Sequence, residues 1–187
     1  FWSEMGISKA ESIIPMTVLE NTVRNDLNTR APRTMAVLDP LKVVLTNFPA
    51  GETEWLEAAV HPQDASMGTR QVPLTREIWI ERDDFMEDPP RKFFRLTPGG
   101  EVRLRNAFII RCTGVARNDA GEVVELQCEF DPATRSGMPG AERKVKGTIH
   151  WVSAEHGRPV EIRLYDRLFT VPNPLGDKRR DYREFLN

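Results

Sequence analysis

The spacing of apolar side chains changes near residue 35. Before it, three apolar residues recur four positions apart and predict one face of a helix: Leu19, Val23 and Leu27. Thr17 with Glu20 three residues later is a capping-box pattern that predicts the start of this helix. Ser8 and Glu11 repeat the pattern and predict a shorter helix ahead of it. The first 34 residues are therefore predicted to be helical.

From Met35 onward the apolar residues alternate with polar ones, which is typical of strands. Turn residues separate the alternating segments, with Asp39-Pro40 marking a bend and residues 118–121 a hairpin turn. Seven segments fit this description: 35–48, 52–60, 76–82, 101–110, 115–130, 143–154 and 160–169. Many short strands between turns predict a mainly β fold, with one antiparallel β-barrel or a pair of them.

The clearest alternation lies in residues 101–110, interpreted as a single strand. Its predicted inward residues are Val102, Leu104, Phe108 and Ile110. Glu101, Arg103 and Arg105 point the other way, so the two guanidinium groups are expected on one face. In segment 160–169, the same reasoning predicts an inward set of Val160, Ile162 and Leu164.

Composition narrows the class of protein. The net charge is -2, with 26 Lys and Arg against 28 Asp and Glu, which argues against indiscriminate nucleic-acid binding. No apolar run approaches twenty residues, so no membrane span is expected. Cys112 and Cys128 each lie in an apolar-periodic run, which favours buried free thiols in a reducing cytoplasm over a disulfide. The missing initiator Met suggests that the chain begins inside a longer protein.

Residues 91–117 depart from this slightly acidic average. They hold seven basic residues and a single acidic one, Glu101. A local positive surface steers an anionic partner to one place. Phe93 and Phe94 lie among the first of these cations, and single-stranded RNA needs both charge for its backbone and rings for its bases. RNA is therefore the expected partner. An ordinary solvated strand face, or a barrel that pairs its arginines with an acidic protein neighbour, remains the alternative.

Other groups of polar residues give weaker indications of a functional site. Six carboxylates lie between Glu77 and Asp88, but their spacing matches no calcium loop, so a solvated loop is favoured over a cation site. His150 and His156 have no acidic or thiol ligand at suitable spacing, and a hydrogen-bonded structural role is expected for His150. Neither a phosphate-binding loop nor a nucleophile motif occurs. The sequence therefore predicts no catalytic residue and no metal site in this chain.

Five segments together resemble a known family: RAPRTMAVLDPLKVVLTNF, RQVPLTREIWIERDDF, RLTPGGEVRLRNAFII, KVKGTIHWVSA and PVEIRLYDRLFTVPNP. They are similar to the C-terminal, anticodon-binding part of the bacterial glutaminyl-tRNA synthetases, which are class I enzymes. They cover nearly the whole chain in the same order. The related eukaryotic and archaeal-type glutamyl-tRNA synthetases share this barrel architecture and remain the nearest alternative.

The resemblance implies a helical segment, 1–34, from the end of the catalytic part, and an anticodon-binding β-barrel region, 35–187, truncated at its C-terminus. It implies a parent ligase that attaches glutamine to its tRNA using ATP with Mg²⁺, as a cytoplasmic monomer that binds neither DNA nor membranes. Because the catalytic motifs and any cofactor site lie outside this chain, the chain alone is expected to be inactive.

The resemblance also implies four anticodon-binding residues. Arg33 matches a residue that helps to bind the middle base, and Arg95 matches the arginine at the third base, a guanosine. Arg103 and Arg105 match those at the first base and its phosphate. Lys92 stands where close relatives carry a glutamine, so no base contact is assigned to it.

Overall fold

The computed structural model describes residue 6 and residues 14–187. Its contacts divide the chain into two units. One comprises Pro32–Val160, and the other includes the helix before it and residues 161–187. Each unit is described by itself. The Ser8 and Glu11 capping pattern lies outside the described residues.

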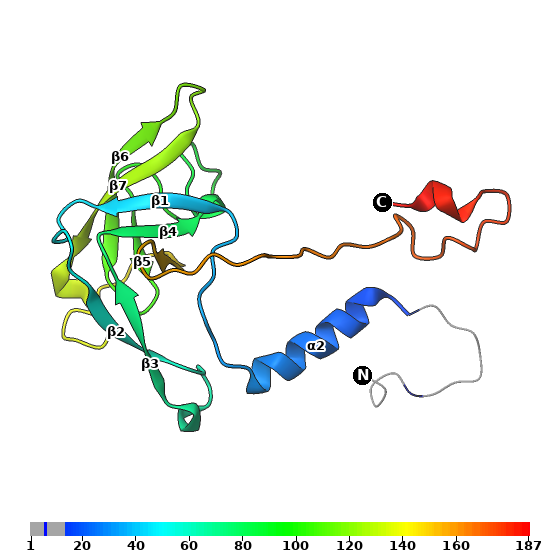
Figure 1. The fold of residues 1–187 in the computed structure, drawn as a ribbon, viewed down its shortest axis with the longest axis horizontal. Coiled ribbons are helices and arrows are strands. Elements are labelled where there is room, and N and C mark those ends of the chain that lie inside the picture. Colours follow the sequence, from blue (N-terminus) through cyan, green and yellow to red (C-terminus); the bar gives the residue numbers. More distant parts are fainter. Residues whose placement is uncertain (1–5, 7–13) are drawn as a thin grey trace. The chain divides into compact units, whose positions relative to one another are not determined.

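The Pro32–Val160 unit is a curled seven-stranded sheet joined by a two-stranded hairpin (Figure 1). The order in the large sheet is β8-β5-β6-β7-β1-β4-β9. Its strands are β1 (Pro40–Leu45), β4 (Glu77–Glu81), β5 (Glu101–Leu104), β6 (Ile109–Arg117), β7 (Val123–Asp131), β8 (Thr148–Ile149) and β9 (Val152–Ser153). The hairpin consists of β2 (Glu54–Ala59) and β3 (Thr69–Leu74).

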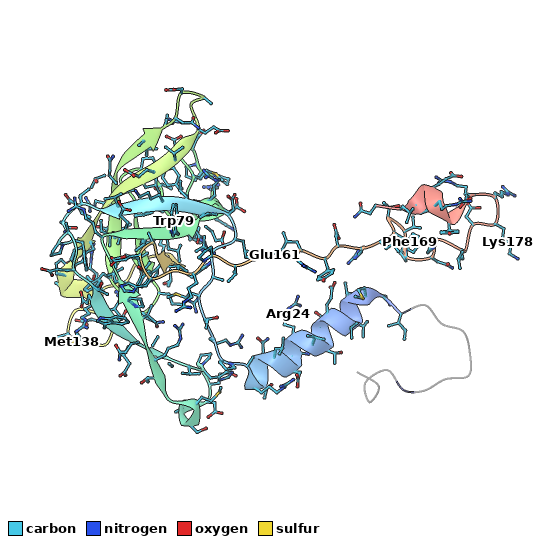
Figure 2. The ribbon with its side chains drawn as sticks, in the orientation of Figure 1. Arg24, Trp79, Met138, Glu161, Phe169 and Lys178 are labelled. Carbon is cyan, nitrogen blue, oxygen red and sulfur yellow. The ribbon has the colours of Figure 1, made fainter. Side chains whose placement is uncertain are left out.

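Most strand pairs are antiparallel, which confirms the predicted mainly β, barrel-like class. Two pairs, β1 with β7 and β5 with β8, are parallel, and alternation alone does not reveal pairing direction. Short 3-10 helices lie at Ala65–Met67, Arg82–Asp84 and Pro132–Thr134. In Figure 2, Trp79 lies on β4, and Met138 lies in the loop that follows the 3-10 helix Pro132–Thr134.

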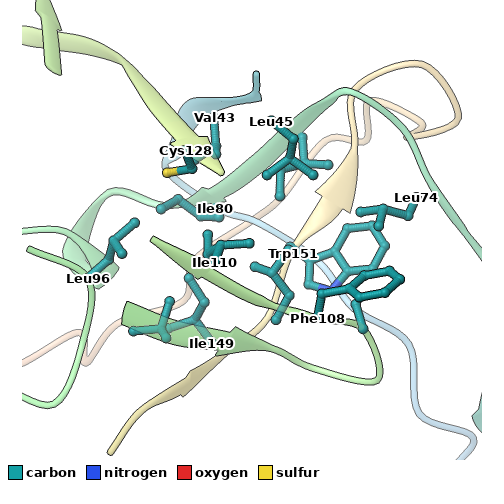
Figure 3. Packing of buried hydrophobic residues seen from close by; sticks show 14 of the residues in the cluster. Val43, Leu45, Leu74, Ile80, Leu96, Phe108, Ile110, Cys128, Ile149 and Trp151 are labelled. Carbon is teal, nitrogen blue, oxygen red and sulfur yellow. The ribbon is translucent and has the colours of Figure 1, made fainter. Parts of the chain in front are cut away.

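The core lies inside the curled sheet, where Trp151, Phe108 and Leu74 lie close together and Ile110 lies near Ile149 (Figure 3). The predicted inward residues of 101–110 are all buried, each at 2% exposure or less. Cys112 and Cys128 are buried free thiols, as predicted, and lie opposite each other on β6 and β7.

Residues 101–110 form two strands and not the single strand predicted. β5 ends at Leu104, whose carbonyl accepts the N–H of Ala107 at 2.9 Å and whose own N–H donates to Phe108 at 2.8 Å. Asn106 occupies the turn at φ 60°, a left-handed conformation that asparagine tolerates well. Val102 and Phe108 are both buried, although the chain turns between them. Arg105 therefore belongs to the turn, and only Arg103 to the strand.

The predicted hairpin at residues 118–121 is confirmed between β6 and β7. Its far end departs from the predicted alternation. Leu126 and Cys128 are buried, whereas Val124 is 42% exposed. A register shift at Ala116 and Arg117 moves this end of the hairpin out of step with the core.

Among the described residues of the other unit, Met16–Arg30 form the α-helix α2. The predicted cap is wrong: Pro15 is the N-cap, no side chain caps the helix, and Thr17 lies within it. Proline suits the start of a helix because its missing N–H has no partner there. The predicted apolar face is exposed, with Leu19, Val23 and Leu27 between 37% and 48%. No helix among the described residues has the length and apolarity to cross a membrane.

Residues 160–169 do not form the predicted strand. Val160 and Leu164 are 70% and 82% exposed. An alternating segment becomes a strand only when a neighbour completes its hydrogen-bond ladder. Among the described residues, only the end of this segment has such a neighbour, where Phe169 forms an isolated antiparallel bridge with Leu186. Further along, Tyr182–Phe185 forms a 3-10 helix with a capping box from Asp181 and Glu184.

Candidate nucleic-acid interface

The side chain of Arg103 extends from β5, and its guanidinium donates hydrogen bonds to other parts of the protein. Its Nη1 donates to the carbonyl of Thr134 at 2.8 Å, and Nη2 donates to those of Ala141 and Arg143, each at 3.0 Å. These carbonyls belong to the long connection between β7 and β8. In the free chain the guanidinium therefore holds this connection against β5.

Arg105 has the opposite arrangement. Its backbone is fixed, because its N–H donates to Ile149 at 2.9 Å and its carbonyl accepts the indole N–H of buried Trp151 at 3.0 Å. Its side chain is exposed and makes no hydrogen bond or ion pair with the described residues. A guanidinium on a rigid backbone with its donors unused is suited to bind a phosphate or a base edge.

Arg95 pairs with a buried carboxylate. Its Nε lies 2.7 Å from Oδ1 of Asp84, and the exposed fractions of the two side chains are 46% and 12%. The backbone brings them together: Phe85 and Leu96 form a parallel bridge, and the N–H of Leu96 donates to the Asp84 carbonyl at 2.9 Å. Phe94 beside them is 46% exposed, so its ring is open to solvent.

Two further groups lie near Asp84. Nε2 of His150 is 3.4 Å from Oε1 of Glu81. The backbone N–H of Leu38 donates to the same oxygen, and that of Asp39 donates to Oε2. Burial pushes the pKa of Glu81 upward, but these donors and His150 outweigh it, so this pKa lies below its ordinary value. Burial raises the pKa of Asp84, and the charge of Arg95 offsets that only in part.

Residues Gly147–Ile149 bring three of the four predicted residues to one region. Gly147 accepts the N–H of Arg103 at 2.9 Å, and Ile149 accepts that of Arg105. On its other side, a Cβ at Gly147 would lie only 2.1 Å from the carbonyl oxygen of Phe94, next to Arg95. This close approach requires glycine. Arg95, Arg103 and Arg105 thus flank one short segment.

Arg33 lies elsewhere in the same unit. It is half-buried, and its backbone N–H donates to the carbonyl of Val60 at 2.7 Å, just beyond the end of β2. The printed sequence offers no pattern that links residue 33 to residues 95–105.

The rest of the basic segment divides into paired and unpaired cations. Arg111 pairs with Glu101, which also binds Arg143, and Arg117 pairs with Glu87. The hydrogen bonds from Arg143 and then Arg111 hold the pKa of Glu101 below its ordinary value. Arg91 and Lys92 of this segment are exposed and have no ion pair among the described residues, and the same holds for Lys144 and Lys146 in the connection between β7 and β8. Sequence reasoning did not select the last two, although the alternation in RKVKG places both outward.

The acidic segment is more ordered than a solvated loop. Glu77 pairs with Lys42 at 3.0 Å, and Asp84 and Glu87 pair with arginines of the basic segment. The carboxylates therefore orient cations. Among the described residues, no group of three or more histidines, cysteines or carboxylates could hold a metal ion.

A curled, mainly antiparallel sheet that presents exposed guanidinium groups and an aromatic ring is typical of modules that bind single-stranded nucleic acid. Residues 31–131 match the family model described as tRNA synthetases class I (E and Q), anti-codon binding domain. Residues 148–187 match a second model with the same description. The chain belongs to this family.

Similar proteins include two named glutamine–tRNA ligase. One, from Xanthomonas euvesicatoria pv. vesicatoria, is 56% identical over 188 residues, which cover 100% of this chain and 32% of the relative. Another, from Bradyrhizobium diazoefficiens, is 55% identical over 174 residues, covering 93% and 31%. The chain thus spans about a third of the length of the curated relatives that it matches.

Proposed function

We propose that this chain binds the anticodon of a glutamine-specific tRNA as part of a glutamine–tRNA ligase. The observation that carries the proposal is the exposed Arg105 guanidinium on a fixed backbone, beside the half-exposed Arg95, in a chain of the anticodon-binding family. The names of the relatives favour glutamine over glutamate.

The proposed roles of the four arginines come from the family resemblance, and the surroundings of each side chain support them. Arg95 contacts the third anticodon base, and Arg105 contacts the first base or its phosphate. Arg103 supports that site by holding the connection between β7 and β8, with its remaining N–H groups directed to the same nucleotide. Arg33 contributes to the middle base from beside the β2–β3 hairpin. Residues 35–187 form the binding region, and 1–34 connect it to the rest of the enzyme.

The rest of the reaction is assigned to the whole ligase. We infer that ATP and Mg²⁺ act outside this chain, and that the ligase is a cytoplasmic monomer that binds neither DNA nor membranes. This chain contributes selection of the tRNA, because a guanidinium offers paired donors to a guanine edge and also offsets phosphate charge.

Binding of tRNA transcripts that differ at one anticodon base tests the proposal. In the full-length protein that carries this chain, each changed base is expected to weaken binding by about 1–3 kcal/mol. Arg95→Ala should remove the preference at the third base alone. Equal binding of all transcripts would contradict base recognition by this region.

Salt dependence separates RNA binding from the protein-interaction alternative. Affinity for tRNA is expected to fall steeply as salt rises, because bound cations of the RNA are released when arginines and lysines replace them. Arg105→Ala should reduce the slope of log affinity against log salt by about 1. A shallow slope that Arg105→Ala leaves unchanged would support the alternative.

A further inference from the structure

Asp84 has the least exposed carboxylate side chain of the ion pairs among the described residues. Its side chain is 12% exposed, whereas that of its partner Arg95 is 46% exposed. Glu87, a few residues later, is 38% exposed in its pair with Arg117. The 3-10 helix Arg82–Asp84 and the Phe85–Leu96 bridge fix the backbone on which Asp84 lies.

Stability does not explain this burial. An ion pair with one half-exposed partner contributes little to folding, and removal of a carboxylate from water disfavours its charged form. Burial is the largest influence on Asp84 and raises its pKa, although Arg95 lies 2.7 Å away. Burial therefore disfavours the charged form of this carboxylate, and the pair with Arg95 offsets that only in part.

The pair does fix the direction of the guanidinium. Nε of Arg95 donates to Asp84, and Nη1 donates weakly to the Phe94 carbonyl at 3.3 Å. Nη2 has no acceptor among the residues that the structure describes. Nη2 and the second hydrogen of Nη1 form the edge that matches two acceptors side by side, as on a guanine.

We propose that Asp84 is a positioning residue for base recognition by Arg95: it holds Nε so that the outer edge of the guanidinium faces the third anticodon base before the tRNA binds. This inference rests on the proposed function. A long side chain that is already oriented loses less conformational freedom on binding, so the gain appears as affinity for the correct base.

The surroundings keep Asp84 available for this role. His150, the other group near it that can carry a positive charge, is directed to Glu81, and Glu81 is occupied by the backbone N–H groups of Leu38 and Asp39. Arg95 is thus the donor to the Asp84 side chain within the described part of the protein.

The experiment compares tRNA transcripts with the matched and a changed third base, bound to the full-length protein that carries this chain. Asp84→Asn keeps the shape but removes the charge, and it should reduce discrimination at the third base by about 3- to 10-fold. Discrimination at the first base should stay unchanged. In an Arg95→Ala background, Asp84→Asn should cause no further loss.

Glu87→Gln is the matched control, because it breaks the ion pair of Glu87 with Arg117, which lies outside the proposed site. It should change discrimination at neither the first nor the third base. Asp84→Glu keeps the charge but moves the carboxylate by one methylene group, so it should also reduce third-base discrimination if Asp84 sets the direction of the Arg95 guanidinium. This second variant tests the idea even where Asp84→Asn lowers the amount of folded protein. The thermal unfolding midpoint of each variant reports folding.

The outcomes separate this inference from the function on which it rests. If Arg95→Ala leaves discrimination intact, the proposed role of Arg95 is wrong. If Arg95→Ala removes it and Asp84→Asn preserves it, Arg95 binds the base without help and the positioning role is overturned. An equal loss at all three bases would also overturn it, because Asp84 would then support the fold in general.

Discussion

At the scale of single residues, neighbouring arginines with the same predicted role have different surroundings. Arg103 donates to three backbone carbonyls, whereas the side chain of Arg105 has no partner among the described residues. A donor already satisfied by the protein has less to gain from RNA, because binding must first replace its existing bonds. The two residues are therefore expected to respond differently to mutation.

Arg103→Ala should destabilise the chain, and Arg105→Ala should not. Loss of charge-assisted bonds to Thr134, Ala141 and Arg143 is expected to lower the free energy of unfolding by about 1.5–3 kcal/mol. Arg105→Ala should stay within about 0.5 kcal/mol of the original chain. Urea unfolding followed by tryptophan fluorescence measures both, and equal effects would refute the distinction.

Glu101 links two arginines and makes a pH-dependent contribution to stability. Because Arg143 and Arg111 lower its pKa in the folded chain, its stabilising effect is fully present above the pKa of the unfolded chain and is lost as pH falls through the folded value. Glu101→Gln should therefore lower the unfolding midpoint at pH 7, and the difference should shrink towards pH 3. A difference that is constant across this range would rule out the ionic origin.

At the scale of elements, the short strand β8 organises the candidate interface. It consists of only Thr148 and Ile149, yet with Gly147 it accepts the backbone N–H groups of Arg103 and Arg105. Gly147, just before the strand, lies against the Phe94 carbonyl. A two-residue strand carries little pairing energy of its own, so close packing keeps it in place.

Gly147→Ala tests that packing. The added methyl would meet a backbone oxygen at 2.1 Å, so β8 must move away from Phe94 or from β5. Overpacking of this kind is expected to cost about 1–3 kcal/mol and to weaken tRNA binding through both Arg95 and Arg105. Thr148→Ala, at the exposed neighbouring position, is the control. Unchanged stability and binding in Gly147→Ala would show that the segment shifts freely.

At the scale of the whole chain, stability is concentrated in the Pro32–Val160 unit. Its curled sheet encloses the buried cluster, whereas residues 161–168 are exposed and have no strand partner in the described structure. Exposed backbone without a ladder is cut readily by proteases.

Limited trypsin digestion of the 187-residue chain should therefore cut after Arg163 and Arg167 before it cuts after Arg103 or Arg111. The latter two lie on strands of the sheet, and their peptide bonds must leave the ladder before cleavage. Mass spectrometry of early fragments gives the order. Initial cuts inside β5 or β6 would show that the sheet opens first.

The sequence by itself determined the mainly β class, the outward face of Glu101 and Arg103, and the burial of both thiols. These follow from alternation, which depends only on neighbours along the chain. The family resemblance, which the family models confirm, selected the arginines. Alternation failed at residues 160–169, which have the pattern of a strand but lack, in the described part of the chain, a neighbouring strand to complete a ladder. It also failed at residues 101–110, where one predicted strand is two strands joined by a turn at Asn106.

Only the tertiary structure decided what each charged group does. Asp84 and Arg95 are separated by ten residues of chain, and Arg103 and Arg143 by many more, so no local pattern reveals their contacts. The acidic segment looked solvated because sequence shows charge but not burial. Long-range pairing of strands brought its carboxylates to the arginines. The pKa of a carboxylate depends on its burial and on the charges around it, and both are set by the tertiary structure.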